Sequence, residues 1–260
     1  MDVSVVIPCY NRRDTIRASV ISVLNQVGDH NIEVLVIDDG SSDDSISQIT
    51  DLGVKILSTG GRRGACHARN VGISMAKHEW IAFNDSDDFW RVDKLAYLVK
   101  VVDFARMDFV FHSFVRQRGS RVVIGGGMAA GIIPGEVLLA NLLKSNFIST
   151  QCILVKKAKL MECDGFDEVL PRFQDWDLAI RLSKISQSIY SVPEPLSYCV
   201  DVVGSISSDF HSGIVARNYL LEKYSSDYSK HFLLRIRMKV GVVVRCCYAK
   251  LFSIKSGSIR

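Results

Sequence analysis

Short runs rich in β-branched residues alternate with longer, helix-like segments through the first half of the chain, and this alternation restricts the fold more than any other feature. The strand-like runs are Val3–Ile7, Glu33–Ile37, Val54–Leu57 and Trp80–Phe83. Strands that are joined by helical crossovers lie parallel in a sheet whose two faces are both covered. The pattern therefore predicts an α/β fold, with a mixed, mainly parallel sheet flanked by helices.

Three segments between these strands favour helices. Residues 14–24 can be capped by Asp14 and present one apolar face made of Ile16, Val20, Val23 and Leu24. The segments 42–52 and 64–77 are the second and third, and the second is more polar. Beyond residue 91 we expect helices over 92–104, 136–144 and 177–186. We also expect strands over 109–115, 121–124 and 152–155, and a flexible glycine-rich loop over 125–135.

Polar clusters follow three of the first four strands. They are Pro8–Asn11, Asp38–Ser41 and Asn84–Asp88. Ligands of such sheets bind beyond the carboxyl ends of the strands, so these clusters mark the expected site. Within the third cluster, Asp85 and Asp87 form an Asp-x-Asp pair, and hard cations such as Mg²⁺ and Mn²⁺ prefer oxygen ligands. Taken alone, the same residues are more typical of a polar turn and a helix cap before Val92.

Other candidate residues are ambiguous when they are considered singly. Asp39 can accept a hydrogen bond from a base or a ribose hydroxyl, or can simply end a strand. Arg62, Arg63 and Arg69 can reach phosphate oxygens, or can be solvated surface charges. Asp175 can cap a helix or act as a general base.

Six segments together give a more specific signal than any of these residues. In chain order they are Val5–Asn11, Val36–Asp43, Ala68–Ile73, Asp85–Asp88, Gly165–Glu168 and Gln174–Leu182. In order and spacing they resemble the family 2 glycosyltransferases, which are inverting, nucleotide-sugar-dependent enzymes with a GT-A fold. The resemblance covers about residues 3–207 and implies a GT-A-type, Rossmann-like fold.

The resemblance also implies roles for individual residues. Pro8, Tyr10 and Asn11 would frame the nucleotide base, and Asp38 and Asp39 would contact the base and ribose. On the diphosphate side it implies a nucleotide-binding arginine, a Mn²⁺ or Mg²⁺ site and a catalytic base, which fall on Arg69, on Asp85 with Asp87, and on Asp175. The donor would be a nucleotide-diphospho-sugar, most simply a UDP-sugar, and the acceptor a glycan or lipid-linked hydroxyl in bacterial surface polysaccharide synthesis.

Two departures from the family pattern keep a second interpretation open. Gln174 stands where many relatives have Glu, and the run Tyr198-Cys199-Val200-Asp201 lacks the arginine and histidine of a common Tyr-Arg-x-His motif. The alternative is a catalytically silent, nucleotide-binding relative. A dinucleotide-binding dehydrogenase is set aside, because its glycine motif should follow the first strand, whereas the glycine-rich stretch here is at 125–135.

The charge distribution divides the chain into two parts. Residues 231–260 carry seven basic and no acidic residues, so the total net charge of +4 leaves −3 for residues 1–230. We expect a catalytic domain over 1–212 and a helical, basic extension over 213–260. The extension would either lie on an anionic membrane or pack on the domain, and no nucleic-acid partner is expected.

The cellular compartment that we expect follows from the cysteines and from the lack of a long apolar run. The chain has seven cysteines, an odd number, and none of them sits in a Cys-x-x-Cys pair. This indicates buried thiols in a reducing compartment. No run is long and apolar enough to span a bilayer, and no signal peptide precedes Val3. We therefore expect a cytoplasmic protein with peripheral contact at the inner face of the plasma membrane.

Overall fold

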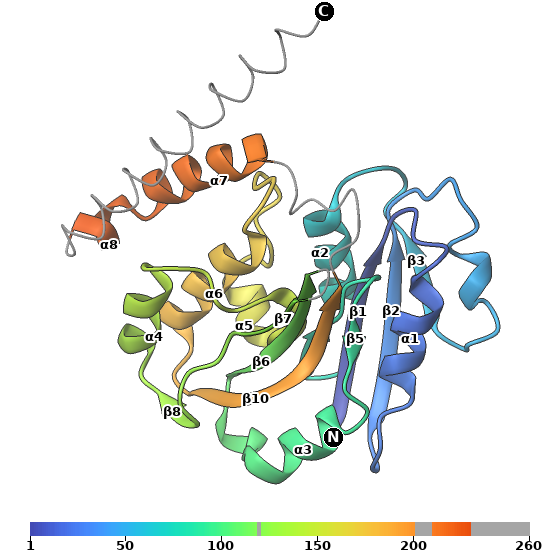
Figure 1. Ribbon diagram of the computed structural model, residues 1–260, viewed down its shortest axis with the longest axis horizontal. Coiled ribbons are helices and arrows are strands. Elements are labelled where there is room, and N and C mark those ends of the chain that lie inside the picture. The colour runs from blue at the N-terminus through green and yellow to red at the C-terminus, as the bar shows by residue number, and fades with distance from the viewer. Residues whose placement is uncertain (119–120, 201–209, 230–260) are drawn as a thin grey trace, which may run out of the picture.

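The structure is a computed structural model that describes residues 1–118, 121–200 and 210–229. Its first half is a run of β–α units, shown at the blue end of Figure 1. In chain order the elements are β1 (Asp2–Cys9), α1 (Ile16–Leu24), β2 (Asn31–Asp38), a 3₁₀ turn (Ser47–Ile49), β3 (Lys55–Ser58), α2 (Ala65–Met75) and β4 (Trp80–Phe83). The four strands are parallel in the order β3-β2-β1-β4, as expected from the alternating pattern.

The second half extends this sheet with strands of both directions. Its elements are β5 (Phe89–Trp90), α3 (Lys94–Val101), a 3₁₀ turn (Phe104–Arg106), β6 (Phe109–Arg118), β7 (Arg121–Gly125), β8 (Gly131–Ile133), α4 (Gly135–Leu142), a 3₁₀ turn (Thr150–Cys152), β9 (Ile153–Lys156), α5 (Lys157–Glu162), α6 (Gln174–Ile185) and β10 (Ile189–Val200). Strand β9 runs antiparallel to β4 and β6, and β10 runs parallel to β6. The sheet is therefore mixed.

Helices pack on both faces of the sheet. One face carries α1 and α3, with Val20 and Leu98 among its buried residues. The other carries α2, α4 and α6, with Leu142 and Trp176 at its centre. This arrangement is the flanked, mixed and mainly parallel sheet that the sequence predicts, and it places the carboxyl ends of β1 and β2 at one edge (Figure 1). Strand β4 runs parallel to β1, so its carboxyl end lies at the same edge.

Three local predictions were wrong. Helix α1 begins at Ile16 with Thr15 at the N-cap, and Asp14 makes no capping bond. The segment 42–52 forms only a 3₁₀ turn, because Asp43 and Ser45 bond to loop backbone instead of leaving it free for a helix. The loop over 125–135 contains β8, which pairs antiparallel with β10.

Helix α6 starts earlier than expected, at Gln174 rather than at Asp177. Its N-cap is Phe173, a bulky residue in the left-handed region with φ of 62°. Asp175 is consequently in the first turn of the helix, not at its cap. The unusual backbone at Phe173 turns the chain just before Gln174 and Asp175.

Two helices follow β10 in sequence. Helix α7 (Phe210–Lys223) crosses the expected domain boundary at residue 212, and α8 (Ser225–Ser229) comes after it. Ala216 and Leu220 are buried in the same core as α6. The basic stretch 231–260 lies outside the described residues. No helix in the described ranges is long and apolar enough to cross a membrane.

Candidate active site

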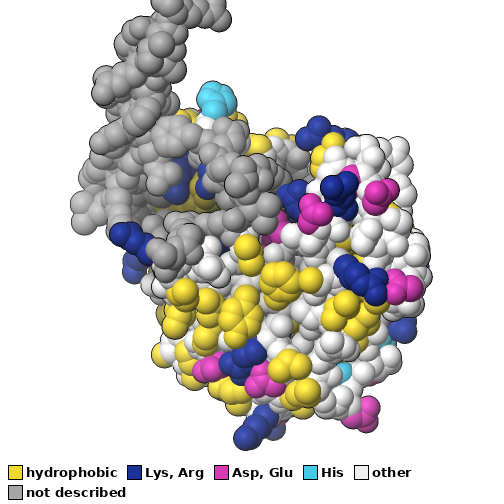
Figure 2. Space-filling model, turned by 45° about the vertical axis from the view of Figure 1, so that its right-hand side comes forward, with side chains coloured by type: hydrophobic (Ala, Val, Ile, Leu, Met, Phe, Trp, Pro, Cys, Tyr) yellow, Lys and Arg dark blue, Asp and Glu magenta, His cyan; other side chains and the backbone are white. Residues whose placement is uncertain are grey.

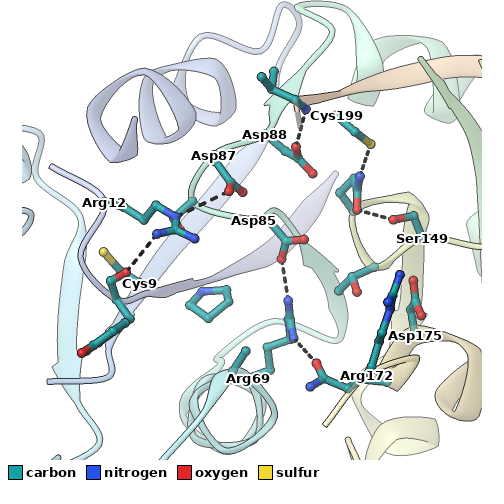
Figure 3. A pocket seen from close by; sticks show the side chains of 18 of the residues that line it. Cys9, Arg12, Arg69, Asp85, Asp87, Asp88, Ser149, Arg172, Asp175 and Cys199 are labelled. Carbon is teal, nitrogen blue, oxygen red and sulfur yellow. Dashed lines mark hydrogen bonds and ion pairs between the residues drawn. The ribbon is translucent and has the colours of Figure 1, made fainter. Parts of the chain in front are cut away.

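A cavity of about 590 Å³ opens at the carboxyl edge of the parallel strands (Figure 3). The ends of β1, β2 and β4 contribute to it, together with the start of α2. The segment 146–151, the start of α6, and strands β6 and β10 complete its wall. Of the residues predicted for the site, the following line this one cavity: Pro8, Tyr10, Asn11, Asp39, Arg69, Asp85, Asp87 and Asp175. Asp38 does not line it, because its carboxylate accepts the backbone N–H of Ser41 (3.0 Å) in the turn after β2.

The side of the cavity where the nucleotide-binding residues are expected is built from the turns after β1 and β2. The guanidinium of Arg62 lies over the ring of Tyr10, and its central carbon is 4.7 Å from the centroid of that ring. The carboxylate of Asp39 is buried and accepts the backbone N–H groups of Arg63 (2.8 Å) and Gly64 (2.7 Å). Asp39 thereby ties the end of β2 to the loop that leads into α2, and this shapes the cavity wall.

The buried side chain of Arg69 connects the Asp-x-Asp turn to the first turn of α6. Arg69, on α2, donates to Oδ1 of Asp85 (2.5 Å) and to Oε1 of Gln174 (3.1 Å). The side chain of Arg69 is 6% exposed. The amide oxygen of Gln174 therefore accepts a hydrogen bond from the second terminal nitrogen of this guanidinium, and it adds no charge next to Asp175.

Three carboxylates follow β4 within one turn. Burial and the neighbouring Asp85 raise the pKa of Asp87, although Arg12 lies 3.5 Å from it. Burial, then Asp85 and Asp87, raise the pKa of Asp88 well above its usual value. Such a cluster favours a cation, and its oxygen donors suit Mg²⁺ or Mn²⁺. Within the described ranges no three acidic, His or Cys side chains converge as a complete metal cage.

Two hydrogen bonds fix the orientation of the Asp175 carboxylate. Its Oδ1 accepts the backbone N–H of Trp176 (2.8 Å) and Nδ2 of Asn146 (3.0 Å). The oxygen of the Asn146 amide accepts the N–H of Ile148 (3.3 Å), which fixes the direction of that amide. Burial raises the pKa of Asp175 to about 6, against the lowering effect of these hydrogen bonds and of Arg69. The group is thus a much stronger base than a solvated carboxylate.

Several cavity residues were not predicted from the sequence. They are Arg12, Arg116, Asn146, Gln151 and Arg172. Arg116 lies on β6 directly opposite Cys199 of β10, the position at which the Tyr-Arg-x-His motif would carry its arginine. A cation therefore lines the cavity beside that position, although it comes from a different strand. Only the pairing of β6 with β10 brings it there, so no local sequence signal marks it.

The comparisons with known proteins agree with this architecture. The model of the family described as glycosyl transferase family 2 matches residues 4–163. The fold is GT-A, and the chain belongs to the family 2 glycosyltransferases.

One curated relative and two solved structures illustrate the similarity. The chain is 25% identical over 252 residues to WfaP of Escherichia coli, a UDP-Glc:α-D-GlcNAc-diphosphoundecaprenol β-1,3-glucosyltransferase, covering 95% of this chain and 96% of WfaP. It superposes on S. aureus TarS in complex with UDP-GlcNAc with a TM-score of 0.69, at 21% identity, covering 85% of this chain and 67% of TarS. It also superposes on the mannosyltransferase PcManGT of Pyrobaculum calidifontis, in complex with GDP-Man and Mn²⁺, with a TM-score of 0.62. There the identity is 19%, covering 99% of this chain and 76% of PcManGT.

Proposed function

We propose that this glycosyltransferase moves a sugar from a UDP-sugar to a hydroxyl group of a lipid-linked or glycan acceptor, with inversion at the anomeric carbon, in bacterial surface polysaccharide synthesis. The observation that carries this proposal is the shared cavity. A carboxylate whose pKa is about 6 lies in the same pocket as a turn rich in carboxylates. Together they provide the two groups that a direct displacement requires, a base for the acceptor and a charge-balancing site for the diphosphate.

Asp175 is proposed as the base. Because Oδ1 already accepts two hydrogen bonds, Oδ2 is the oxygen that remains for the acceptor hydroxyl. As the acceptor oxygen attacks, its proton passes to Oδ2, the new C–O bond forms at the anomeric carbon, and the bond from that carbon to the diphosphate breaks. The diphosphate leaves with the electron pair of the broken bond. A base with a pKa near 6 is largely deprotonated at pH 7 and still accepts a proton effectively.

A divalent cation is proposed at the Asp-x-Asp turn, held by Asp85 and Asp87. When bound, it would offset the charge on the departing diphosphate. Among the described residues, Asp85 and Asp87 would supply only part of a coordination shell, which suits a metal that is also held by substrate phosphates. Arg69 donates a hydrogen bond to the carboxylate of Asp85 and so holds that carboxylate in place. The Mn²⁺ in the complex of PcManGT supports the same assignment by analogy of fold.

The donor and acceptor classes rest on the relatives. WfaP is described as using UDP-Glc and a diphosphoundecaprenol-linked sugar, and its similarity extends over nearly the whole of both chains. The TarS complex contains UDP-GlcNAc. These similarities support a uridine nucleotide as the donor carrier and a polyprenyl-linked acceptor.

Thermal unfolding in the presence of candidate donors tests this proposal. UDP-glucose and UDP-GlcNAc are each added with Mn²⁺, with Mg²⁺ and with EDTA, and GDP-mannose serves as the comparison. We expect a higher unfolding temperature with at least one UDP-sugar plus metal, since a ligand that binds the native state stabilises it. Slow release of UDP from that donor would show that the site is catalytic. Protection without hydrolysis or transfer would instead favour a silent nucleotide-binding protein.

A further inference from the structure

Lys94 is the first residue of α3, and its side chain is fully buried and has no part in the proposed mechanism. Its ammonium group donates one hydrogen bond to the backbone carbonyl of Gln151 (2.9 Å) and another to the hydroxyl of Ser197 (3.3 Å). The ammonium nitrogen also lies 3.7 Å from the centroid of the Trp90 ring. An ammonium group has three N–H donors, and these three contacts can occupy all of them.

The burial of Lys94 is costly for a charged side chain. Figure 2 shows lysine and arginine side chains that reach the surface, whereas Lys94 is 0% exposed. No carboxylate among the described residues offsets its charge, and the titratable groups that act on its pKa are the thiols of Cys152 and Cys199. Burial lowers the pKa of Lys94 to about 7. A methionine of similar length would fill this space without that cost, so packing alone does not account for the lysine.

The carbonyl that Lys94 holds belongs to the wall of the cavity. We call residues 146–151, all of which line the cavity, the wall segment. The carbonyl oxygen of Gln151 accepts the hydroxyl of Ser197 (3.3 Å) in addition to the ammonium group. In the side chain of Gln151, Oε1 accepts the hydroxyl of Ser149 (2.8 Å; Figure 3). The backbone and the side chain of Gln151 therefore both hold one end of the wall segment.

The other end of the wall segment holds the proposed base. Asn146 donates to Oδ1 of Asp175 (3.0 Å), and its own amide oxygen accepts the N–H of Ile148 (3.3 Å). Near the opposite end, the N–H of Cys152 donates to the carbonyl of Ser149 (2.9 Å). Helix α3 packs on one face of the sheet, and α6, which carries the base, packs on the other. The wall segment therefore links a buried donor on one side of the sheet to a carboxylate on the other.

We propose that Lys94 is a positioning residue that holds the wall segment in place and so keeps Asn146 in contact with Asp175. Lys94 does not line the cavity, so it acts on the reaction only through this segment. Without the lysine, the segment moves more freely and Asp175 keeps only the hydrogen bond from the N–H of Trp176. The proposal rests on the proposed function, because the hydrogen bonding of this carboxylate affects transfer only if the carboxylate is the base.

Hydrogen–deuterium exchange of the full chain, followed by mass spectrometry, tests the local part of the proposal. The variant Lys94→Met keeps the length of the side chain and removes both hydrogen bonds. The matched control is Lys157→Met, because Lys157 also donates to backbone carbonyls, those of Ser74 (3.0 Å) and Ala76 (2.8 Å), but lies outside the cavity. We expect the amides of the wall segment to exchange roughly tenfold faster in Lys94→Met, since loss of a charged donor lets the segment open more often. In Lys157→Met they should exchange at the unmodified rate.

Ser197→Ala keeps the test decisive if Lys94→Met does not fold. It removes the hydroxyl that donates to the same carbonyl and accepts from the ammonium group. We expect exchange of the wall segment to be about threefold faster, because a neutral donor contributes less than a charged one. Ser197→Ala then replaces Lys94→Met in both measurements.

The pH dependence of sugar transfer tests the functional part. We measure kcat/KM against pH for Lys94→Met, Asn146→Ala and the double variant. A carboxylate that loses a hydrogen bond is a weaker acid, so Lys94→Met should move the acid limb to higher pH, by no more than Asn146→Ala does. The double variant should have the acid limb of Asn146→Ala, because both substitutions act through the same contact. Lys157→Met should leave the limb in place.

Unchanged exchange of the wall segment in the folded variant would overturn the proposal. Faster exchange with an unmoved acid limb would also overturn it, as would shifts that add in the double variant, since either result separates Lys94 from Asn146. If the unmodified chain transfers no sugar from any UDP-sugar while exchange changes as expected, the proposed function fails and the role of Lys94 in holding the wall segment stands.

Discussion

The guanidinium of Arg69 and the carboxylate of Asp85 lie 2.5 Å apart, in a contact that joins the start of α2 to the end of β4. The same guanidinium donates to Gln174 at the first turn of α6. One buried cation thus links the Asp-x-Asp turn to the helix that carries Asp175. The distance between the proposed metal site and the proposed base therefore depends on Arg69.

Replacing Arg69 by Met should destabilise the fold. The change leaves Asp85 without its cation and Gln174 without its donor. Removal of one partner from a buried ion pair costs about 3–5 kcal/mol, and we expect about 2–3 kcal/mol here because Asp85 is partly exposed. Urea unfolding measures the loss. The control is Arg17→Met, which breaks an exposed pair with Asp51 and should have a much smaller effect on unfolding. Similar losses in both variants would contradict a structural role for the Arg69 contact.

The rate of transfer should depend on pH through Asp175. Burial raises the pKa of this carboxyl to about 6, and the base works only when deprotonated. Activity should therefore be lost as the pH falls through about 6, rather than near the ordinary value for Asp. The dependence of kcat/KM on pH measures this. An acid limb near pH 4 would show that Asp175 is solvated or is not the base.

Asn146 should set the position of that acid limb. Its amide donates to Asp175 and lowers the pKa of the carboxyl, against burial and the charge of Asp85, while Arg69 also lowers it. Asn146→Ala should move the limb to higher pH by up to about one unit, since one hydrogen bond to a charged group is worth about 1.5 kcal/mol. Asn141→Ala, which truncates a half-buried asparagine that lies outside the cavity and is bonded within α4, should leave the limb in place. An unchanged limb in both variants would limit Asn146 to a packing role.

Asp87→Ala should weaken metal-dependent nucleotide binding. The side chain lines the cavity within a carboxylate cluster that favours a cation. Calorimetric titration with UDP and Mn²⁺ should show affinity at least about tenfold lower than that of the unmodified chain, the scale of effect expected for a lost metal contact. Asp44→Ala, at an exposed position outside the cavity, is the control. If UDP binds the unmodified chain equally well in EDTA, the metal assignment is wrong.

The phenol of Tyr224 should contribute to stability from outside the resembling segments. It donates to the buried carboxylate of Asp177 on α6 (2.6 Å), which Arg181 and Lys223 also contact. Tyr224→Phe should cost about 1.5 kcal/mol, the lower end for a hydrogen bond to a charged group. Tyr219→Phe removes a similar bond to the less buried Asp167 and should cost less. No measurable loss in Tyr224→Phe would indicate that the segment after α7 adds no stability through Asp177.

The sequence predicts the parallel half of the fold because the information there is local. Strands β1 and β4 and the second half of β2 are continuous runs of buried residues, and the polar clusters at their carboxyl ends meet because parallel strands end together. The amino-acid pattern alone therefore places Asp39, Asp85 and Asp87 at one edge of the sheet. The same pattern also predicts Asp38 for the site, but Asp38 does not line the cavity, since the turn after β2 uses that carboxylate for the N–H of Ser41.

The other wall of the site depends on contacts between distant segments. Arg116 reaches the cavity through the pairing of β6 with β10, and Asn146 does so because the segment after α4 packs against the start of α6. Neither position carries a local pattern that distinguishes it. The start of α6 was missed for a similar reason, because its N-cap is a phenylalanine in the left-handed region rather than a capping polar residue.

The central claim is that Asp175 removes the acceptor proton, and Asp175→Asn tests it most directly. Asn keeps the shape of the side chain and can still accept the N–H of Trp176, but it cannot take up a proton as a base. With a UDP-sugar donor and a lipid-linked acceptor, we predict that kcat falls by about 10²–10⁴-fold while the affinity for the donor changes little. Asp164→Asn, the same substitution at an exposed position outside the cavity, should leave kcat unchanged. Near-normal turnover in a folded Asp175→Asn protein would contradict the account and place the base elsewhere.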